Sequence, residues 1–554
     1  MRPVQAMLKV LRDEGVDKVF GNPGTTELSF VDALVDSGDI EYVLGLQEAS
    51  VVAMADGYAR ATGRPAFVSL HAAAGLANGL VGLLNAGRSR TPLVVTAGQQ
   101  DRRHLVQDPM LSADLVRLAG AAVKHSFDVQ HAPDLPILLR RAFHLATQPP
   151  AGPIFLSVPM DLLAEDTDVD VPGRSTVVPL GPADRIDDAA AILAGARHPA
   201  IVAGDGVGRD GATAELTLVA EALGATTYHQ PMNDGLDFPT AHPLYAGVLA
   251  PVNALIREAL APHDVVLIVG CHAFMAHHYS PGSAIPDDTR VVQLDADSAE
   301  IGRNFRVELG LVGGIRASLA AMADELSAAT RENSAEIRTR TRARADRTAD
   351  ERGRWDASAL AAYGPAPLDP LAAVHAIACA LPEDAVVIEE AITSGVLLRR
   401  VLRQTRPKSF VHTVGGGLGS GIGAAIGSRM GDPDRPVVAV LGDGCAMFGL
   451  QGLWSAARYA VPVTFVVMNN GEYRTLKETL DSRPGDPGRS TGHTGLSLGP
   501  PALDFTTAAA FFGMETVRVS DARELTEIIG KAGQRVAPLL VDVPLRGHRS
   551  GGAR

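Results

Sequence analysis

Residues 435 to 480 read RPVVAVLGDGCAMFGLQGLWSAARYAVPVTFVVMNNGEYRTLKETL. Two short apolar runs lie in this stretch, Val437 to Leu441 and Val463 to Met468, and each ends in a polar turn. Such runs predict buried strands. Between them, apolar side chains at mixed three- and four-residue spacing predict a helix over Met447 to Tyr459 that packs on a sheet. The stretch therefore predicts a strand, helix, strand unit of a parallel α/β sheet.

Asp443 and Asn470 follow the two predicted strands, with 26 residues between them. Ligands of parallel α/β sheets gather beyond the carboxyl ends of the strands, so we expect these two side chains to converge. A carboxylate and an amide oxygen suit Mg²⁺, and the backbone carbonyl of Glu472 is a candidate third ligand. Mg²⁺ keeps positions open for phosphate, and Gly444 lets backbone amides approach a diphosphate closely.

The sequence Gly442-Asp443-Gly444, followed after 24 residues by Asn469-Asn470, resembles the signature of thiamine-diphosphate-dependent enzymes. The resemblance implies that Asp443 and Asn470 bind Mg²⁺ and that the metal binds the cofactor diphosphate. It also implies that the turn from Gly442 to Cys445 contacts the cofactor. The alternative is that these are two unrelated polar turns after strands. The presence of both parts of the signature, Gly-Asp-Gly and Asn-Asn, at this spacing argues against it.

The whole chain has 554 residues, which is too long for one ordinary core and favours three domains. Its net charge of −13 gives no sign of the basic surface that nucleic-acid-binding proteins carry, so we expect a small-molecule site. The three cysteines are odd in number and far apart, which argues against a disulfide framework or a zinc site and fits a reducing cytoplasm. No apolar run is long enough to span a membrane, and no signal peptide is visible.

Four motifs near the N-terminus, GNPGTTE (21–27), LQEA (46–49), SLHAAAG (69–75) and VTAGQQ (95–100), resemble in this order the pyrimidine-binding domain of benzoylformate decarboxylases. Taken alone, Glu48 is typical of a carboxylate at a helix start, and His71 of a satisfied histidine at a strand end. The resemblance implies that Glu48 binds N1′ of the cofactor pyrimidine and promotes removal of the thiazolium C2 proton. It implies that Thr25 and His71 orient the substrate.

The middle of the chain carries two weaker motifs. Gly206-Val-Gly208-Arg-Asp-Gly211 matches a dinucleotide fingerprint, but no acidic residue follows at the required strand end, so a Gly-rich turn is favoured over nucleotide or FAD binding. Three histidines lie close together at 272, 277 and 278 without obvious zinc partners. Aligned by resemblance, His277 corresponds to the family's second catalytic histidine.

The last third contains further residues that the resemblance places at the cofactor. Thr393 and Ser394 follow a predicted strand, where their hydroxyls are candidates for diphosphate binding. The turn Gly415-Gly-Gly-Leu418 resembles one in which a backbone carbonyl, here that of Gly416, holds the 4′-amino group. Leu418 would then hold the cofactor in its bent conformation.

The residues that would line the substrate pocket depart from the family. A helix predicted after Asn470 places Thr475, Leu476 and Thr479 on one face, where the family has small, apolar and aromatic residues. Ile392 replaces a threonine. The missing aromatic wall puts benzoylformate itself in doubt as the substrate.

These observations predict an α/β protein with three doubly wound parallel-sheet domains: a pyrimidine-binding domain (1–180), a central domain (183–345) and a diphosphate-binding domain (366–545). The resemblance implies non-oxidative decarboxylation of a 2-oxo acid to an aldehyde, with thiamine diphosphate and Mg²⁺. It also implies a homodimer with shared active sites, within a homotetramer. One alternative is a carboligase of the acetolactate synthase or benzaldehyde lyase type. Another is a non-enzymatic paralogue, and the intact Glu48, Asp443 and Asn470 argue against that one.

Overall fold

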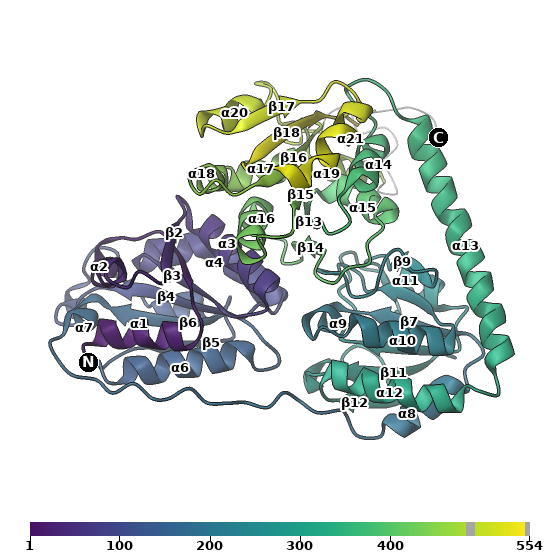
Figure 1. Cartoon of the computed structure of the whole chain (residues 1–554), viewed down its shortest axis with the longest axis horizontal. Coiled ribbons are helices and arrows are strands. Elements are labelled where there is room, and N and C mark those ends of the chain that lie inside the picture. The colour runs from purple at the N-terminus through teal and green to yellow at the C-terminus, as the bar shows by residue number, and fades with distance from the viewer. Residues whose placement is uncertain (483–492, 549–554) are drawn as a thin grey trace. The chain divides into compact units, whose positions relative to one another are not determined.

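The computed structural model describes residues 1–482 and 493–548, and these form three six-stranded parallel sheets with intervening helices (Figure 1). The prediction of three doubly wound α/β domains is confirmed. The chain divides into two compact units. One unit holds Met1–Thr176, Tyr363–Gly395 and Thr413–Arg554, and therefore contains the first sheet and every strand of the third sheet except β14 (Phe410–His412); the other holds Val177–Ala362 and Val396–His412.

The first sheet has the strand order β2-β1-β3-β4-β6-β5. Its strands are β1 (Lys18–Gly21), β2 (Glu41–Leu44), β3 (Ala66–Leu70), β4 (Leu93–Gln99), β5 (His125–Asp128) and β6 (Ile154–Pro159). The helices are α1 (Pro3–Asp13), α2 (Leu28–Val35), α3 (Glu48–Thr62), α4 (Ala72–Arg88), α5 (Leu115–Ala119), α6 (Asp134–Thr147) and α7 (Met160–Ala164). Side chains from α1 and α6 share one apolar core with β1, β4 and β6.

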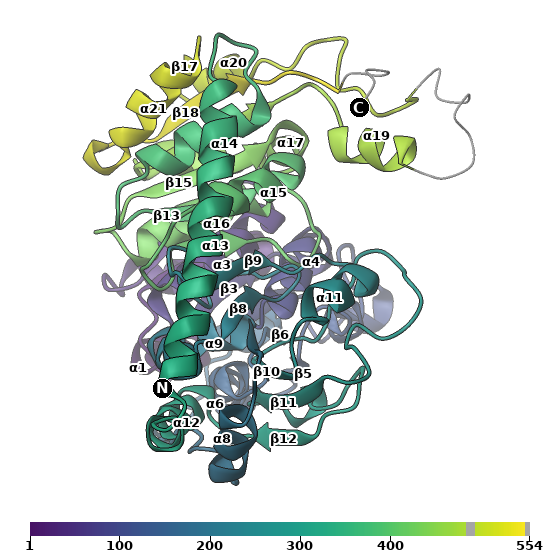
Figure 2. The same ribbon diagram turned by 90° about the vertical axis from the view of Figure 1, so that its right-hand side faces the viewer.

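The central sheet has the order β12-β11-β10-β7-β8-β9. Its strands are β7 (Pro199–Ala203), β8 (Thr226–His229), β9 (Tyr245–Val248), β10 (Val265–Val269), β11 (Arg290–Asp295) and β12 (Leu309–Val312). Its helices are α8 (Ile186–Ala194), α9 (Asp205–Arg209), α10 (Thr213–Leu223), α11 (Asn253–Leu260), α12 (Ile315–Ala329) and α13 (Ser334–Ala361), the long helix in Figure 2.

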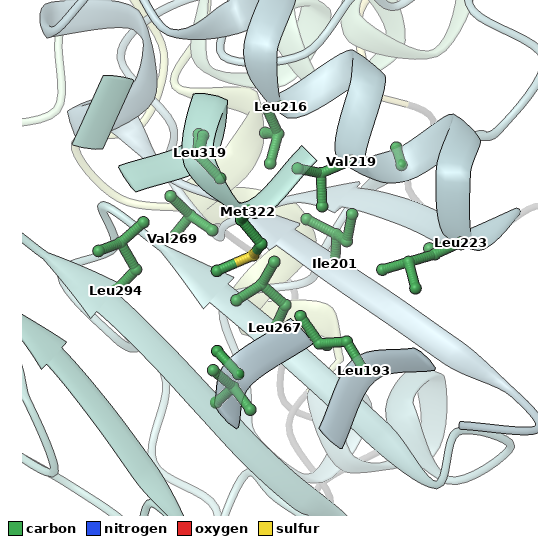
Figure 3. Packing of buried hydrophobic residues seen from close by; sticks show 14 of the residues in the cluster. Leu193, Ile201, Leu216, Val219, Leu223, Leu267, Val269, Leu294, Leu319 and Met322 are labelled. Atoms are coloured by element: carbon green, nitrogen blue, oxygen red, sulfur yellow. The ribbon is translucent and has the colours of Figure 1, made fainter. Parts of the chain in front are cut away.

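Successive residues of the central strands serve two different cores, as expected for a sheet covered on both faces. Figure 3 shows one core, in which Ile201 of β7 and Leu267 of β10 pack with Met322 of α12. The neighbouring residues Val202 and Ile268 belong to the opposite core, which α11 covers. Near-continuous apolar runs in the sequence are the consequence of this double coverage.

The third sheet has the order β14-β13-β15-β16-β18-β17. Its strands are β13 (Val386–Glu390), β14 (Phe410–His412), β15 (Val437–Gly442), β16 (Val463–Asn469), β17 (Glu515–Arg518) and β18 (Leu539–Pro544). Its helices are α14 (Pro370–Ala380), α15 (Ile392–Val401), α16 (Ser420–Gly431), α17 (Asp443–Gly449), α18 (Gly452–Arg458), α19 (Arg474–Asp481), α20 (Phe505–Phe511) and α21 (Ala522–Gly530).

The first and third sheets share one topology, because in both the strands follow the order 2-1-3-4-6-5 when numbered within the domain. No internal repeat is visible in the sequence. In this order the chain reverses direction across the sheet between the first and third strands, which is where open α/β sheets bind ligands. The expected ligand edges are therefore the carboxyl ends of β1 and β3, and of β13 and β15.

Close packing of α3 on α16 joins the first and third sheets within their compact unit. A Cβ atom at Gly427 would lie 1.8 Å from the carbonyl oxygen of Met54, and one at Gly57 would lie 2.1 Å from that of Ala424. Only glycine permits this approach at either position. The helix that begins at Glu48 is thus fixed against the helix that follows the Gly415 to Leu418 turn.

Two sequence interpretations are wrong in detail. The helix expected over Met447 to Tyr459 is instead two helices, α17 and α18. At the junction the backbone N–H groups of Leu453 and Trp454 bond the carbonyls three residues earlier, Leu450 and Gln451 (both 3.1 Å), which interrupts the α-helical pattern. The glycines at 206 and 208 belong to the short helix α9 and not to a turn. Every helix in the described residues is too short or too polar to cross a bilayer. The domain limits remain a prediction.

Candidate functional site

Asp443 and Asn470 lie side by side at the carboxyl ends of β15 and β16. The Asp443 carboxylate accepts hydrogen bonds from the backbone N–H groups of Gly444 (2.7 Å), Asn470 (3.0 Å) and Gly471 (2.6 Å). Adjacent pairing of β15 with β16 brings the two turns together. The structure therefore produces the juxtaposition that the strand-end argument predicts.

This cluster has the chemistry of a hard-cation site. Asp443 is 4% exposed, and burial raises the pKa of its carboxyl against the opposing effect of the backbone donors. A divalent cation would offset that penalty by favouring the ionised form. The Asn470 side-chain oxygen accepts from the Glu472 N–H (3.0 Å), which fixes the turn that presents the Glu472 carbonyl.

The Glu472 side chain points to other partners. Its carboxylate bonds the Lys477 ammonium (2.5 Å) and the backbone N–H of His548. Burial acts to raise the pKa of Glu472, but these donors lower it overall. Lys477 is itself buried. The carboxylate orients the turn, and the carbonyl remains the group available to a metal.

Gly444 is closely packed at this edge. A Cβ at Gly444 would lie 2.7 Å from the ring of Tyr473, so only glycine fits there. Gly442 ends β15 and precedes the first turn of α17, in which Cys445 is buried. Burial raises the pKa of the Cys445 thiol, which keeps it protonated. Small residues and helix N–H groups make this turn suitable for a diphosphate.

The first turn of α15 lies at the end of the adjacent strand β13. It carries Thr393 and the buried Ser394, and Ile392 is 42% exposed at the helix start. β13 pairs with β15, so this turn and the Asp443 turn occupy the same edge of the sheet. The hydroxyls are therefore placed at the edge where the sequence analysis expects a diphosphate.

The turn before α16 is held by two residues that the sequence analysis did not assign. Gly416 has a φ of +79°, a conformation that favours glycine. Glu390, at the end of β13, accepts the N–H groups of Gly419 (3.0 Å), Ser420 (3.1 Å) and Gly421 (3.0 Å). Burial raises the pKa of Glu390 to about 8 although these three donors act to lower it.

Asn85 of α4 holds the same turn from the first domain. Its side-chain amide donates to the Gly417 carbonyl (2.7 Å) and the Ser420 hydroxyl (2.6 Å), and its oxygen accepts from the Gly417 N–H (3.0 Å). Asn85 is 332 residues from Gly417 in the sequence. The turn that contains Gly416 and Leu418 is thus fixed from both sides.

Glu48 begins α3 and is 7% exposed. Asn22 donates to one of its carboxylate oxygens (3.2 Å), and Asn78 donates to the other (3.1 Å). A Cβ at Gly75 would lie 3.3 Å from the Glu48 carboxylate, so the glycine gives it space. The carboxylate is held by neutral partners in its own domain.

His71 lies at the end of β3 and bonds a buried carboxylate. Its Nδ1 is 2.9 Å from Oε2 of Glu27 and 3.1 Å from the hydroxyl of Thr26. Glu27 also accepts the N–H groups of Gly24 and Gly98, both at 2.9 Å. The carboxylate therefore fixes the ring with Nδ1–H as a donor and Nε2 as the second proton-exchanging atom. Thr25 belongs to the same short 3₁₀ turn as Glu27.

His277 belongs to the other compact unit, in an exposed loop after β10. Its Nδ1 lies 3.2 Å from Nε2 of His278, and its backbone N–H bonds the Pro251 carbonyl (2.8 Å). The neighbouring His272 instead bonds Glu300 (2.9 Å). The pairing of His277 with His71 stays a prediction.

The helix expected after Asn470 is α19. Thr475 and Thr479 are one turn apart, and the Thr479 hydroxyl donates to the Thr475 carbonyl (2.8 Å). Leu476 is 48% exposed. The helix therefore presents two hydroxyl-bearing residues and one aliphatic residue, with no aromatic ring among these three positions.

Known proteins match all three domains. Models of the thiamine pyrophosphate enzyme family match residues 1–118 (N-terminal TPP binding domain), 186–322 (central domain) and 393–543 (C-terminal TPP binding domain). Benzoylformate decarboxylase of Pseudomonas aeruginosa is 34% identical over 549 residues, covering 97% of this chain and 98% of that protein.

Two further relatives extend the comparison. A Mycobacterium tuberculosis protein that is provisionally named an acetolactate synthase large subunit is 32% identical. The match covers 98% of this chain and 99% of that protein. The structure of the thiamine diphosphate-dependent 4-hydroxybenzoylformate decarboxylase of Rhodococcus jostii RHA1 is 30% identical with a TM-score of 0.86, covering 99% of this chain and 100% of that one.

Proposed function

Because the chain belongs to the thiamine pyrophosphate enzyme family, we propose that it decarboxylates a 2-oxo acid without oxidation, releasing an aldehyde and carbon dioxide. The observation that carries this proposal is the Glu27–His71 pair at the carboxyl end of β3. A fixed histidine at the ligand edge suits proton transfer to and from a substrate, which decarboxylation to an aldehyde requires. Similarity to benzoylformate decarboxylases along the whole chain supports the same reaction class.

The third domain would hold the diphosphate end of the cofactor. Asp443, Asn470 and the Glu472 carbonyl would bind Mg²⁺, and the turn from Gly442 to Cys445 would lie against the diphosphate. Thr393 and Ser394 would add hydroxyl donors. The donors are oxygens at one sheet edge, and the buried Asp443 would gain from a cation, so the site fits the ion.

The pyrimidine end would meet the first domain. Bound thiamine diphosphate supplies a nucleophilic thiazolium carbon and an electron sink. The Glu48 carboxylate, held by Asn22 and Asn78, would bind N1′ of the pyrimidine. The Gly416 carbonyl would accept from the 4′-amino group, and Leu418 would support the bent conformation.

Residues around the substrate would orient it and move protons. Thr25 and His71 would bind the carboxylate and the carbonyl, and Nε2 of His71 would donate or accept a proton there. His277 would exchange the second proton. Ile392, Thr475, Leu476 and Thr479 would surround the side chain, which favours a substrate that does not need an aromatic wall.

We propose a homodimer, within a homotetramer, in which Glu48 of one subunit meets Asp443 of its partner. We also propose domains at 1–180, 183–345 and 366–545, each containing one of the three sheets. The three free cysteines are consistent with a reducing cytoplasm.

A carboligase is the second candidate, because the mycobacterial relative named as an acetolactate synthase subunit is nearly as similar as the decarboxylase. A carboligase would transfer the same cofactor-bound carbon to a second carbonyl. The product separates the two reactions, since decarboxylation yields aldehyde and carbon dioxide in equal amounts.

The test is to supply thiamine diphosphate, Mg²⁺ and a panel of 2-oxo acids and to measure carbon dioxide and aldehyde together. Equal release from at least one acid, lost in Glu48→Gln, is the expected result. Asp443→Ala should lose the cofactor on desalting, since the metal would lack its carboxylate ligand. Carbon dioxide without aldehyde, accompanied by a coupled product, would instead establish the carboligase.

A further inference from the structure

Three side chains from separate segments converge outside the proposed cofactor site: Asp481, His493 and His548. Asp481 is the last residue of α19, His493 precedes α20 in the chain, and His548 follows β18. Their ligand atoms all lie within 4.8 Å of one another. Within residues 1–482 and 493–548, they form the one group of three histidine, cysteine, aspartate or glutamate side chains so arranged.

The two histidines bond the two oxygens of one carboxylate. Nε2 of His493 is 3.0 Å from one Asp481 oxygen, and Nε2 of His548 is 2.6 Å from the other. The two imidazole rings are nearly perpendicular, with centroids 5.8 Å apart. Both rings turn Nε2 toward the carboxylate, so the three possible metal-ligand atoms lie close together.

The surroundings keep these side chains in place. The side chains of His493 and His548 are only 14% and 16% exposed, and that of Asp481 is 31% exposed. The backbone N–H of His548 bonds the Glu472 carboxylate, which in turn bonds Lys477.

We propose that Asp481, His493 and His548 form a second metal site, which takes a divalent transition metal of the zinc type and is distinct from the Mg²⁺ site at Asp443. Two imidazole nitrogens and one carboxylate oxygen suit Zn²⁺ or Co²⁺, whereas Mg²⁺ prefers oxygen ligands alone. Three protein ligands leave a fourth position for water.

Metal binding requires a defined movement of protons. Each Nε2 must offer its lone pair to the metal, so the proton between it and Asp481 must leave. In a neutral ring the proton moves to Nδ1, and in a cationic ring it is released to solvent. The metal replaces these protons and joins the end of α19 to the segments at 493 and 548.

The site would act on the element that carries the proposed substrate wall. Thr475, Leu476 and Thr479 lie within two turns of Asp481 on α19. A metal at the end of the helix would restrict its motion without contacting the substrate. The metal site itself does not depend on the proposed reaction.

The experiment uses the holoenzyme with thiamine diphosphate and excess Mg²⁺, so that the Asp443 site is already filled. Co²⁺ is titrated while visible absorption is recorded, and Zn²⁺ is then added to displace it. We expect one Co²⁺ per chain with the absorption of a nitrogen- and oxygen-ligated ion, lost on addition of Zn²⁺. Thermal unfolding should shift to higher temperature with Zn²⁺.

Variants identify the ligands. We expect a large loss of Co²⁺ affinity in each of the variants His493→Ala, His548→Ala and Asp481→Asn. Loss of a group that only orients a metal ligand typically weakens binding by roughly 10- to 100-fold, and loss of a ligand itself should exceed this. His131→Ala, an exposed histidine elsewhere, is the matched control and should bind as the wild type does.

The exposed pair His277 and His278 is a competing place for the ion, so His277→Ala/His278→Ala is titrated in parallel. Retention of binding in that double variant supports the proposal. Absence of an additional Co²⁺ in the Mg²⁺-loaded enzyme would overturn it, as would loss of binding only in the double variant. If the cluster is only an ion pair, the three ligand variants should unfold at a lower temperature, and neither Co²⁺ nor Zn²⁺ should change the unfolding temperature of the wild type. This result too would overturn the proposal.

Discussion

At the scale of single residues, the proposed chemistry depends on a histidine whose orientation is set by a buried carboxylate. Glu27 accepts bonds from His71 and from two backbone N–H groups, so it is itself immobilised. A proton-transfer group works only if the correct ring nitrogen faces the substrate. Glu27 therefore supports the site by fixing the histidine, although the sequence analysis did not identify it.

We expect His71→Ala to lower kcat/KM for decarboxylation by about 10²-fold or more, since a positioned acid or base contributes that much. Glu27→Gln should have a smaller effect, because an amide oxygen can still accept from Nδ1–H and keep the ring in place. Steady-state kinetics measure both. An unchanged rate in His71→Ala would remove this histidine from the mechanism.

The wall of the substrate pocket gives a second prediction at this scale. Thr479 occupies the position where benzoylformate decarboxylases are expected to carry an aromatic ring. Thr479→Phe should raise the preference for benzoylformate over aliphatic 2-oxo acids, since an aromatic contact contributes about 0.5–1.5 kcal/mol, or up to roughly tenfold. Leu480→Phe, one position along α19, is the control. Competition between the two substrates measures the ratio, and a fall in the benzoylformate preference would contradict the assignment of this wall.

At the scale of elements, the sequence predicted the buried strands around Asp443 well and the helix between them less well. Val437 to Leu441 reads as a buried strand because both faces of the sheet are covered, so the apolar run is continuous. The single helix expected over Met447 to Tyr459 is divided at Leu450 and Gln451, where the backbone hydrogen bonds change to i→i+3, a local change that the apolar spacing does not indicate.

The same distinction applies to the site. Asp443 and Asn470 could be paired in advance because both follow neighbouring parallel strands. Asn85 could not, because its partner Gly417 lies 332 residues away on another domain and no local pattern joins them. Long-range hydrogen bonds decide which polar residues support a site, and they appear only once the fold is known.

The Gly415 to Leu418 turn provides a prediction about cofactor affinity. Asn85→Ala removes three hydrogen bonds to this turn and leaves the Gly417 N–H and carbonyl without that partner. We expect thiamine diphosphate to bind at least about tenfold more weakly, since one buried unsatisfied group costs about 1–3 kcal/mol. Cofactor titration measures the effect. Ser420→Ala loses one of these bonds and should be milder; equal affinity in Asn85→Ala and the wild type would show that the turn does not need this support.

The carboxyl that caps α16 provides a prediction about pH. Burial raises the pKa of Glu390 from 4.5 to about 8, so the folded protein binds this proton more tightly than the unfolded chain. The stabilising contribution is therefore complete below about pH 4.5 and is lost as the pH rises to 8, with a slope of at most about 1.4 kcal/mol per pH unit.

Glu390→Gln should flatten this dependence. It should also lower stability, because the side-chain NH2 of glutamine cannot accept from the Gly421 N–H as the second Glu390 oxygen does. Denaturation midpoints in urea between pH 5 and 8, wild type against variant, test the prediction. A difference between the two proteins that does not vary with pH would show that Glu390 does not titrate in this range.

At the scale of the whole molecule, the repeated 2-1-3-4-6-5 topology makes the first and third domains structurally equivalent partners. Each has a ligand edge at the carboxyl ends of its strands, with Glu48 and His71 on one domain and Asp443 and Asn470 on the other. A cofactor with a pyrimidine at one end and a diphosphate at the other suits a pair of such edges. Inside one chain, the bonds to Glu48 come from Asn22 and Asn78 of its own domain.

The proposed dimer places these two edges on different subunits, and this can be tested by complementation. Glu48→Gln and Asp443→Asn should each be nearly inactive alone. If the site is shared, a mixed dimer contains one site with both native residues and one site with both replaced, as two-fold symmetry requires. Unfolding and refolding an equal mixture makes about half of the dimers mixed, so about one quarter of wild-type activity should return. Refolding each variant alone is the control. Failure of the mixture to exceed either variant, with dimers shown to exchange subunits by differently tagged chains, would place Glu48 and Asp443 in the same chain's active site.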